Sequence, residues 1–181
     1  MKNTKVNLIH FLSALSFSSL LLTISAQLTD SSDVTALGLL QATFPLLAFS
    51  SGDPCLPPTT YTWVKCSSDA IPRVTALNLG TALLTGSLPD FSAMDALEII
   101  DLSNNVLQGD FPDFLANFPK LKVLNLANNY LSGTVPTSLR DKSQANTLKL
   151  TLTGEGMALC FSDDYTCATE TNQEQEHRGP E

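Results

Sequence analysis

Hydrophobic positions along the middle of the chain recur with a period of 23 or 24 residues. The pattern L-x-x-L-x-L-x-x-N-x-L-x-G-x-L-P is filled from Leu97 and again from Leu121, with other apolar residues at a few leucine positions. A third copy starts at Val74 and departs only at Ala82, which stands in the asparagine position. Self-similarity at a fixed period of this length is typical of a repeat architecture. The pattern predicts three repeats, at about 74–96, 97–120 and 121–144.

Each repeat is expected to form one coil of an α/β solenoid. The two leucines of the L-x-L segment point to one side of a short strand and into the core, while the residue between them faces outward. Asn105 and Asn129 follow the strand, where their amides can hydrogen-bond the turn and the neighbouring repeat as a structural asparagine ladder. The glycine permits a turn with positive φ, and the proline suits an extended stretch that needs no donor. Such a coil cannot bury its apolar face alone, so both ends of the stack need caps.

Residues 27–73 are expected to form the N-terminal cap. A helix is predicted from Asp33 to Phe44, with Asp33 as its capping residue. Leu37, Leu40 and Phe44 lie on one face of this helix at helical spacing, which indicates that this face covers the first repeat. The helix is expected to end near Pro45.

Residues 145–167 are expected to form a terminal strand and the C-terminal cap. Leu148 and Leu150 lie 24 residues after two leucines of the last repeat, which predicts one more strand of the same kind. Thr153 then stands in the asparagine position, so this segment is interpreted as a cap and not as a full repeat.

The N-terminus has the layout of a secretory signal peptide. Lys2 and Lys5 precede the apolar stretch 11–22, and Ala26 offers a small residue for cleavage. The alternative is a signal anchor, but serines dilute the stretch, which is also short for a bilayer span of about 20 residues. We therefore expect residues 1–26 to be removed and the mature chain to be secreted.

All four cysteines follow this cleavage site, and an even number in an oxidising compartment indicates two disulfides. Cys55 and Cys66 lie near one end of the mature chain and Cys160 and Cys167 near the other, so pairing within each close pair is favoured over the two other connectivities. Trp63 is expected to pack in the cap beside the first bond. A zinc site is disfavoured because neither pair has C-x-x-C spacing and no histidine accompanies them. No metal site is expected.

Charge narrows the range of partners. The 181-residue chain has a formal net charge of −8, and loss of the two lysines within residues 1–26 leaves 8 basic against 18 acidic residues, or −10. An acidic chain with scattered basic residues is a poor partner for nucleic acid, so none is expected. No second apolar stretch of membrane-spanning length follows the first, and the polar run 168–181 is expected to be a disordered acidic tail. We therefore expect neither a membrane anchor nor a lipid-anchor signal.

The sequence offers few residues that could carry out catalysis. The mature chain has one histidine, His177, which lies in the polar tail, so histidine-dependent catalysis is excluded. The carboxylate pairs 110 with 113 and 163 with 164 are interpreted as solvated loop residues. No G-x-G-x-x-G loop is present. The protein is expected to be no enzyme and to need no cofactor.

The outward face of the predicted strands is the candidate binding surface, because repeat proteins present a continuous concave array there. The residues between the paired leucines are interpreted as equivalent positions, namely Asn78, Asp101, Asn125 and Lys149, and Ile99 and Val123 beside them form a small apolar strip. The candidate binding residues are Asn78, Ile99, Asp101, Val123, Asn125 and Lys149. An ordinary solvated strand face remains the alternative interpretation.

Four motifs mark a family resemblance. They are G-D-P-C at 52–55, W-V-x-C at 63–66, P-R-V-T-x-L at 72–77 and D-L-S-N-N at 101–105. The chain resembles the leucine-rich-repeat ectodomains of plant receptor-like proteins and receptor-like kinases, especially kinases that also carry a malectin-like ectodomain. The resemblance implies a short, plant-type, right-handed superhelix with cysteine-bearing N- and C-terminal caps. No kinase or malectin-like region accompanies it in this sequence, so kinase activity is not carried over.

The resemblance implies a secreted recognition module in plant extracellular signalling or defence, located in the apoplast or cell wall. Its expected partner is an extracellular protein or peptide, for which a receptor-kinase ectodomain is one candidate. Two alternatives stay open. The chain could be a truncated receptor ectodomain without independent function, or an inhibitor of a secreted microbial hydrolase.

Overall fold

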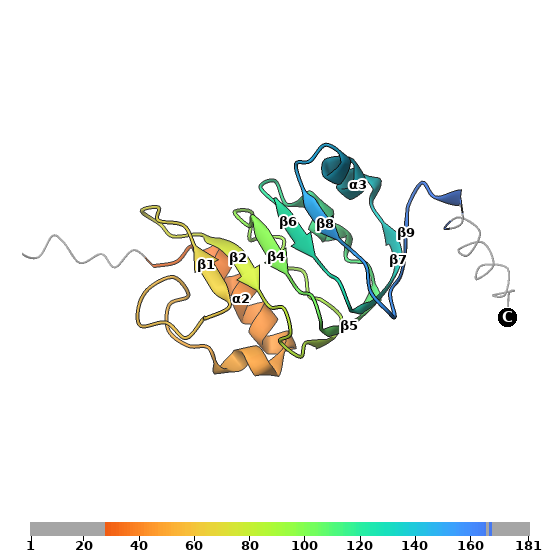
Figure 1. Cartoon of the computed structure of the whole chain (residues 1–181). Coiled ribbons are helices and arrows are strands. Elements are labelled where there is room, and N and C mark those ends of the chain that lie inside the picture. The colour runs from red at the N-terminus through yellow and green to blue at the C-terminus, as the bar shows by residue number, and fades with distance from the viewer. Residues whose placement is uncertain (1–27, 166, 168–181) are drawn as a thin grey trace, which may run out of the picture.

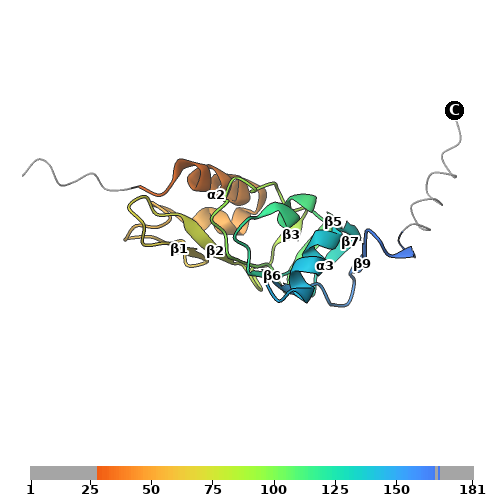
Figure 2. The ribbon, with the colours of Figure 1, turned by 90° about the horizontal axis from the view of Figure 1, so that it is seen from above.

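The computed structural model of the chain describes residues 28–165 and 167. The predicted signal peptide 1–26 and tail 168–181 lie outside these described residues. In the described part the chain advances steadily from an N-terminal cap, through stacked repeats, to a C-terminal segment at the opposite end (Figure 1). Seen from above, helix α2 (Ser31–Thr43) and helix α3 (Thr137–Gln144) lie toward these two ends (Figure 2).

One strand from each repeat enters a five-stranded sheet with the order β1-β2-β4-β6-β8. The first strand is antiparallel to its neighbour, and the remaining strands are parallel and follow the order of the sequence. The five strands are β1 (Val64–Cys66), β2 (Val74–Asn78), β4 (Ile99–Asp101), β6 (Val123–Asn125) and β8 (Lys149–Thr151).

The return side of the repeats forms a second sheet, with the order β3-β5-β7-β9. Its strands are β3 (Thr85–Gly86), β5 (Val106–Asp110), β7 (Tyr130–Val135) and β9 (Ala158–Phe161). The 3-10 helix η2 (Asp113–Asn117) and helix α3 connect this sheet back to the first one in successive repeats. Every repeat therefore contributes a strand to each sheet, and neighbouring repeats are joined by parallel pairing.

The hydrophobic core fills the space between the two sheets. Leu77, Ile100 and Leu124 occupy the same position in successive strands, and each is 0% exposed. Full burial of one such side chain contributes about 1.5–3 kcal/mol. Phe91, Phe114 and Phe118 add an aromatic cluster, with the ring centroids of Phe91 and Phe114 5.0 Å apart. The periodic leucines of the sequence are thus the residues that join the repeats into one core.

The repeat asparagines satisfy backbone groups of two coils at once. Asn129 is 0% exposed; its Nδ2 donates to the carbonyls of Leu102 (3.0 Å) and Leu126 (2.9 Å), and its Oδ1 accepts from the Leu107 amide (3.1 Å). Asn105 makes the equivalent bonds to the preceding repeat. Backbone N–H and C=O groups at the strand ends face the core, where water does not reach them. The asparagine side-chain amides supply the hydrogen-bond partners that these buried groups need.

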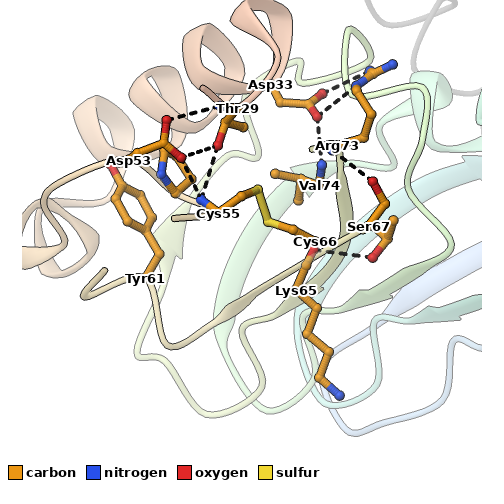
Figure 3. Close-up of a disulfide and its surroundings, with 12 residues drawn as sticks. Thr29, Asp33, Asp53, Cys55, Tyr61, Lys65, Cys66, Ser67, Arg73 and Val74 are labelled. Carbon is orange, nitrogen blue, oxygen red and sulfur yellow. Dashed lines mark hydrogen bonds and ion pairs between the residues drawn. A yellow bond between two sulfur atoms is a disulfide. The ribbon is translucent and has the colours of Figure 1, made fainter. Parts of the chain in front are cut away.

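The N-terminal cap helix begins at Ser31, two residues before its predicted start at Asp33. Asp30, and not Asp33, is the capping residue, because its Oδ1 accepts from the amide of Ser32 at 2.9 Å. Asp33 instead lies in the first turn, fully buried, where it accepts from Nε and Nη2 of Arg73 at 3.0 and 3.1 Å and from the Val74 amide at 2.7 Å (Figure 3). The predicted capping role of Asp33 was wrong because its carboxylate faces the first repeat. The cap is thereby fixed to the start of β2.

The buried face of the cap helix agrees with its pattern, since Leu37, Leu40 and Phe44 are at most 2% exposed. After α2, the 3-10 helix η1 (Pro45–Phe49) turns the chain towards Trp63. The Trp63 indole donates to Ser50 Oγ at 2.9 Å, and the residue is 9% exposed. It is part of the same core cluster as the cap leucines.

Both predicted disulfides are present, joining Cys55 to Cys66 and Cys160 to Cys167. The first links the loop after η1 to the end of β1, beside the hydrogen bonds between Thr29 and Asp53 (Figure 3). The second links β9 to the last described residue. One covalent bond therefore closes each end of the stack.

The register of the last strand differs from the sequence-based alignment by two residues. Leu150, and not Leu148, pairs with Leu124, so the final repeat is longer than the one before it. The cause is the connection: α3 has 8 residues, where η2 in the preceding repeat has 5. Thr153 is consequently not in the asparagine position, because its carbonyl accepts from the Asn128 amide as the Ala127 carbonyl accepts from Asn104.

Candidate recognition surface

The outward side chains of the five-stranded sheet form rows that run across the strands. We call this surface the strand face. Cross-strand pairing defines its first row as Lys65, Ala76, Ile99, Val123 and Lys149. The second row consists of Asn78, Asp101, Asn125 and Thr151. The six candidate binding residues of the sequence therefore lie together on one face, in two neighbouring rows.

Lys149 lies in a different row from the one predicted. The sequence aligned Lys149 with Asp101 and Asn125, whereas β8 pairs Lys149 with Val123 and places Thr151 opposite Asn125. The displacement follows from the two extra residues of the last connection. Because side chains alternate along a strand, a shift of two residues keeps Lys149 on the outward face while moving it to the first row.

The first row has an apolar centre and charged ends. Ile99 and Val123 are half-buried, and Ala76 beside them is only 2% exposed. Lys65 and Lys149 are exposed, while the residues before and after each of them contact the core. The exposed apolar area is accordingly small and confined to two neighbouring strands.

The second row is polar and locally ordered. Asp101 Oδ1 accepts from the amide and from Oγ of Ser103, at 3.0 and 2.7 Å. Asn125 Oδ1 accepts from the Ala127 amide at 3.2 Å. These bonds hold both side chains in place at the strand ends, which lowers the conformational entropy that a binding partner must overcome.

One ion pair joins the residues that directly precede β4 and β6. Lys122 Nζ lies 2.8 Å from Glu98 Oε2, on adjacent repeats just before the strands. The Lys122 side chain is 64% exposed, so this pair stabilises the fold by at most about 1 kcal/mol. Its main effect is that the two charges cancel each other locally.

A second exposed row was not anticipated from the sequence. Leu83, Val106 and Tyr130 are 70%, 44% and 54% exposed and lie at the same position in successive repeats, directly after the asparagine position. We call these residues the lateral row, because Val106 and Tyr130 are the first residues of β5 and β7 and Leu83 lies two residues before β3. The sequence does contain a signal for this row, because each repeat has a hydrophobic residue at a position for which the repeat pattern specifies no residue type.

The acidic pairs show no catalytic arrangement in the described part of the chain. Asp110 and Asp113 line an open hollow of about 570 Å³, and its other lining residues are Phe111, Gly133, Thr134, Pro136 and Ser162, with no histidine or lysine among them. Asp163 and Asp164 both pair with Arg140. The amide of Phe161 and then Arg140 hold the pKa of Asp164 below its usual value. Neither acidic pair therefore has the surroundings of a catalytic site.

Among residues 28–165 and 167, no group of three or more potential metal ligands comes together. Within the same residues, no helix combines the length and the apolar character needed to cross a bilayer.

Comparison with known proteins relates this architecture to a known group. The family model described as Leucine rich repeat matches residues 72–131 and 95–151. Over 117 residues the chain is 37% identical to a probable LRR receptor-like serine/threonine-protein kinase of Arabidopsis thaliana, a match that covers 50% of this chain and 12% of that protein. Over 65 residues it is 40% identical to a probable inactive receptor kinase of the same plant, covering 35% of this chain and 10% of that protein. The chain thus spans about a tenth of the length of these curated relatives.

A solved structure gives the same relationship in three dimensions. The crystal structure of the LRR ectodomain of the receptor kinase SOBIR1 from Arabidopsis thaliana is similar with a TM-score of 0.57 and 27% sequence identity. The similarity covers 73% of this chain and 70% of that chain.

Proposed function

We propose that this leucine-rich-repeat protein, which is homologous to Arabidopsis LRR receptor kinases and folds like the LRR ectodomain of one of them, binds another protein through its strand face. The observation that carries the proposal is the strand face itself. It places half-buried apolar side chains next to polar side chains that are already held by hydrogen bonds. An apolar centre with a polar border is the usual composition of a protein-binding surface.

Binding without catalysis is the activity that these residues support best. The exposed acids have ion-pair or loop surroundings, and residues 28–165 and 167 contain no histidine that could act as a general base. Residues such as Asp101 and Asn125 offer fixed hydrogen-bonding groups, which suit recognition.

We place the protein outside the cell, in plant signalling or defence, with an extracellular protein or peptide as partner and a receptor-kinase ectodomain as the first candidate. Two disulfides support an oxidising compartment. The signal peptide at residues 1–26 is part of the same proposal. We also take the stacked repeats to wind as a right-handed solenoid, the handedness that parallel crossover connections adopt in about 98% of cases.

The experiment is a binding screen of the secreted protein against a panel of plant receptor-kinase ectodomains. Asp101→Arg and Asn125→Arg change the strand face, and Gln108→Arg, an exposed position of β5, adds the same side chain to the second sheet. We expect an ectodomain to bind, the two strand-face variants to weaken binding by about tenfold or more, and Gln108→Arg to leave it unchanged. Absence of any binding, or equal effects of all three variants, contradicts the proposal.

A further inference from the structure

The two ends of the first row carry the same charge. Lys65 in β1 pairs with Ala76, and pairing then continues through Ile99 and Val123 to Lys149 in β8. Read across the sheet, the row is a lysine, three apolar residues and a second lysine. The two lysines come from opposite edges of the sheet, one from the antiparallel cap strand and one from the last strand.

Neither of these ammonium groups has a partner within the described residues. The ion pairs found there use Arg73, Lys122 and Arg140 as their cations, and no side-chain hydrogen bond of Lys65 or Lys149 is present. Figure 3 shows the Lys65 side chain directed away from the Cys55–Cys66 disulfide and from the buried Asp33–Arg73 pair. Two unpaired cations in a chain of net charge −8 are a local exception to its acidic character.

We propose that the first row binds an extended peptide segment that carries two carboxylate side chains separated by apolar residues. This inference rests on the proposed function and specifies the partner of the strand face. Each carboxylate meets one lysine, and the apolar side chains between them cover Ile99 and Val123. The row therefore selects peptides that are negatively charged at both ends and apolar in the middle.

The dimensions of the row suit a strand-like ligand. Neighbouring strands lie about 4.8 Å apart, so the four steps from Lys65 to Lys149 span about 19 Å. An extended chain rises about 3.3 Å per residue, and alternate side chains point to the same side. Residues 1, 3, 5 and 7 of a peptide therefore cover about 20 Å on one face. Acids at positions 1 and 7 reach the lysines, while apolar residues at positions 3 and 5 lie over the apolar centre.

The charges near the row bear on its specificity. Glu98 is neutralised by Lys122 at 2.8 Å, and both groups lie outside the first row. Asp101 in the second row is the nearest unpaired acid on the sheet, and its Oδ1 accepts two hydrogen bonds from Ser103. This carboxylate disfavours additional negative charge at the centre of a ligand. It leaves the two ends of the row, several strands apart, as the places where acids are attracted.

The experiment measures binding of labelled heptapeptides to the secreted full chain by fluorescence anisotropy. The probes are Glu-Ser-Leu-Ser-Leu-Ser-Glu and its analogues ending in Gln or in Lys at both ends. We expect the Glu peptide to bind most tightly and Lys65→Ala or Lys149→Ala to weaken it about two- to fivefold each, the range of exposed ion pairs. Lys65→Glu combined with Lys149→Glu should reverse the preference, so that the Lys peptide binds better than the Glu peptide.

Lys120→Glu is the matched control, because Lys120 is exposed, lies outside the strands of the sheet and changes net charge as Lys65→Glu does. We expect it to leave binding within twofold of the unmodified protein. Equal affinity for the Glu and Gln peptides overturns the inference, as does an equal effect of Lys120→Glu and Lys65→Glu. Equally tight binding of a short single-stranded DNA also overturns it, since the row would then be a general anion site.

The same variants separate failure of this inference from failure of the proposed function. If a receptor ectodomain binds and Asp101→Arg abolishes binding, while lysine variants and peptides have no effect, the strand face stands and the inference fails. If no ectodomain binds and Asp101→Arg changes nothing, the proposed function fails.

Discussion

Replacing Asn129 by alanine tests the repeat architecture at its most buried polar group. The Asn129 side chain is 0% exposed and makes hydrogen bonds of 2.9, 3.0 and 3.1 Å to the backbone of three leucines. Asn129→Ala removes these bonds and adds no replacement, so the Leu107 amide and two carbonyls lose their amide partner inside the stack.

The magnitude follows from the number of bonds. Three hydrogen bonds at about 1 kcal/mol each give about 3 kcal/mol, and an unsatisfied buried amide adds further cost, so we expect a loss of about 3–4 kcal/mol in the free energy of unfolding. This is a large part of a total stability of about 5–15 kcal/mol. For a chain of this size it corresponds to a melting temperature lower by about 10 °C.

The assay is urea denaturation followed by circular dichroism, with Asn104→Gly as the control. Asn104 is exposed and has a φ of 56°, which glycine adopts without strain, so its replacement should cost less than about 1 kcal/mol. Asn105→Ala should resemble Asn129→Ala, because it removes the equivalent bonds from the neighbouring repeat. If Asn129→Ala costs no more than Asn104→Gly, the reasoning that assigns the ladder a stabilising role is refuted.

Three further predictions concern the caps. Arg73→Met leaves the fully buried Asp33 carboxylate without its cation and should reduce stability by about 3–5 kcal/mol, and adding Asp33→Asn should recover part of this loss in the same denaturation assay. Gly154→Ala should reduce stability by about 2 kcal/mol or more, since the φ of Gly154 is 156° and a Cβ would lie 2.5 Å from the Asn128 amide nitrogen. Gly38→Ala should instead stabilise the protein by about 0.5–1 kcal/mol, because a Cβ on Gly38 in α2 would lie in open space. Thermal melts in which the Gly154 variant is more stable than the Gly38 variant contradict both expectations. Burial raises the pKa of Asp53, but hydrogen bonds from Thr29 and from the Cys55 amide outweigh it and hold the pKa below its usual value of 3.8. A lowered folded pKa adds stability above the unfolded pKa of about 3.9 that is lost as pH falls through the folded value. Asp53→Asn should therefore be less stable than the unmodified protein near about pH 6 and converge with it towards about pH 2, and a constant difference would exclude this role.

The parts of the fold that follow from periodicity were predictable. Leucine spacing identified the buried strand positions such as Ile100 and Leu124, because side chains alternate along a strand and only one face is covered. Cysteine spacing also gave the disulfide pairs, since Cys55 and Cys66 lie far along the chain from Cys160 and Cys167. In both cases a local pattern determines which residues meet.

The errors arose where distant contacts decide the structure. Asp30 and Asp33 are both acceptable helix caps by sequence, and only the position of Arg73, 40 residues after Asp33, draws Asp33 into the core. The register of Lys149 depends on the length of α3, a helix in a connection that the repeat pattern does not constrain. A repeat pattern therefore specifies the strands more strongly than the segments between them.

The candidate site likewise contains residues that the repeat pattern identified and one that only a distant contact places there. The sequence identified Ile99, Asp101, Val123 and Asn125 as outward positions, because they flank the buried leucines. It did not identify Lys65, which belongs to the cap strand and joins the first row only through antiparallel pairing with Ala76. Contacts between a cap and a repeat have no periodic signal.

The most direct test of the central claim is site-specific photo-cross-linking of the protein to its bound partner. A photoreactive phenylalanine replaces Asn125 on the strand face or Gln108 on the second sheet, and cross-linked complexes are detected by mass spectrometry. Binding through the strand face predicts abundant cross-links from position 125 and few from position 108. Cross-links from position 108 with none from position 125 would show that the partner binds elsewhere.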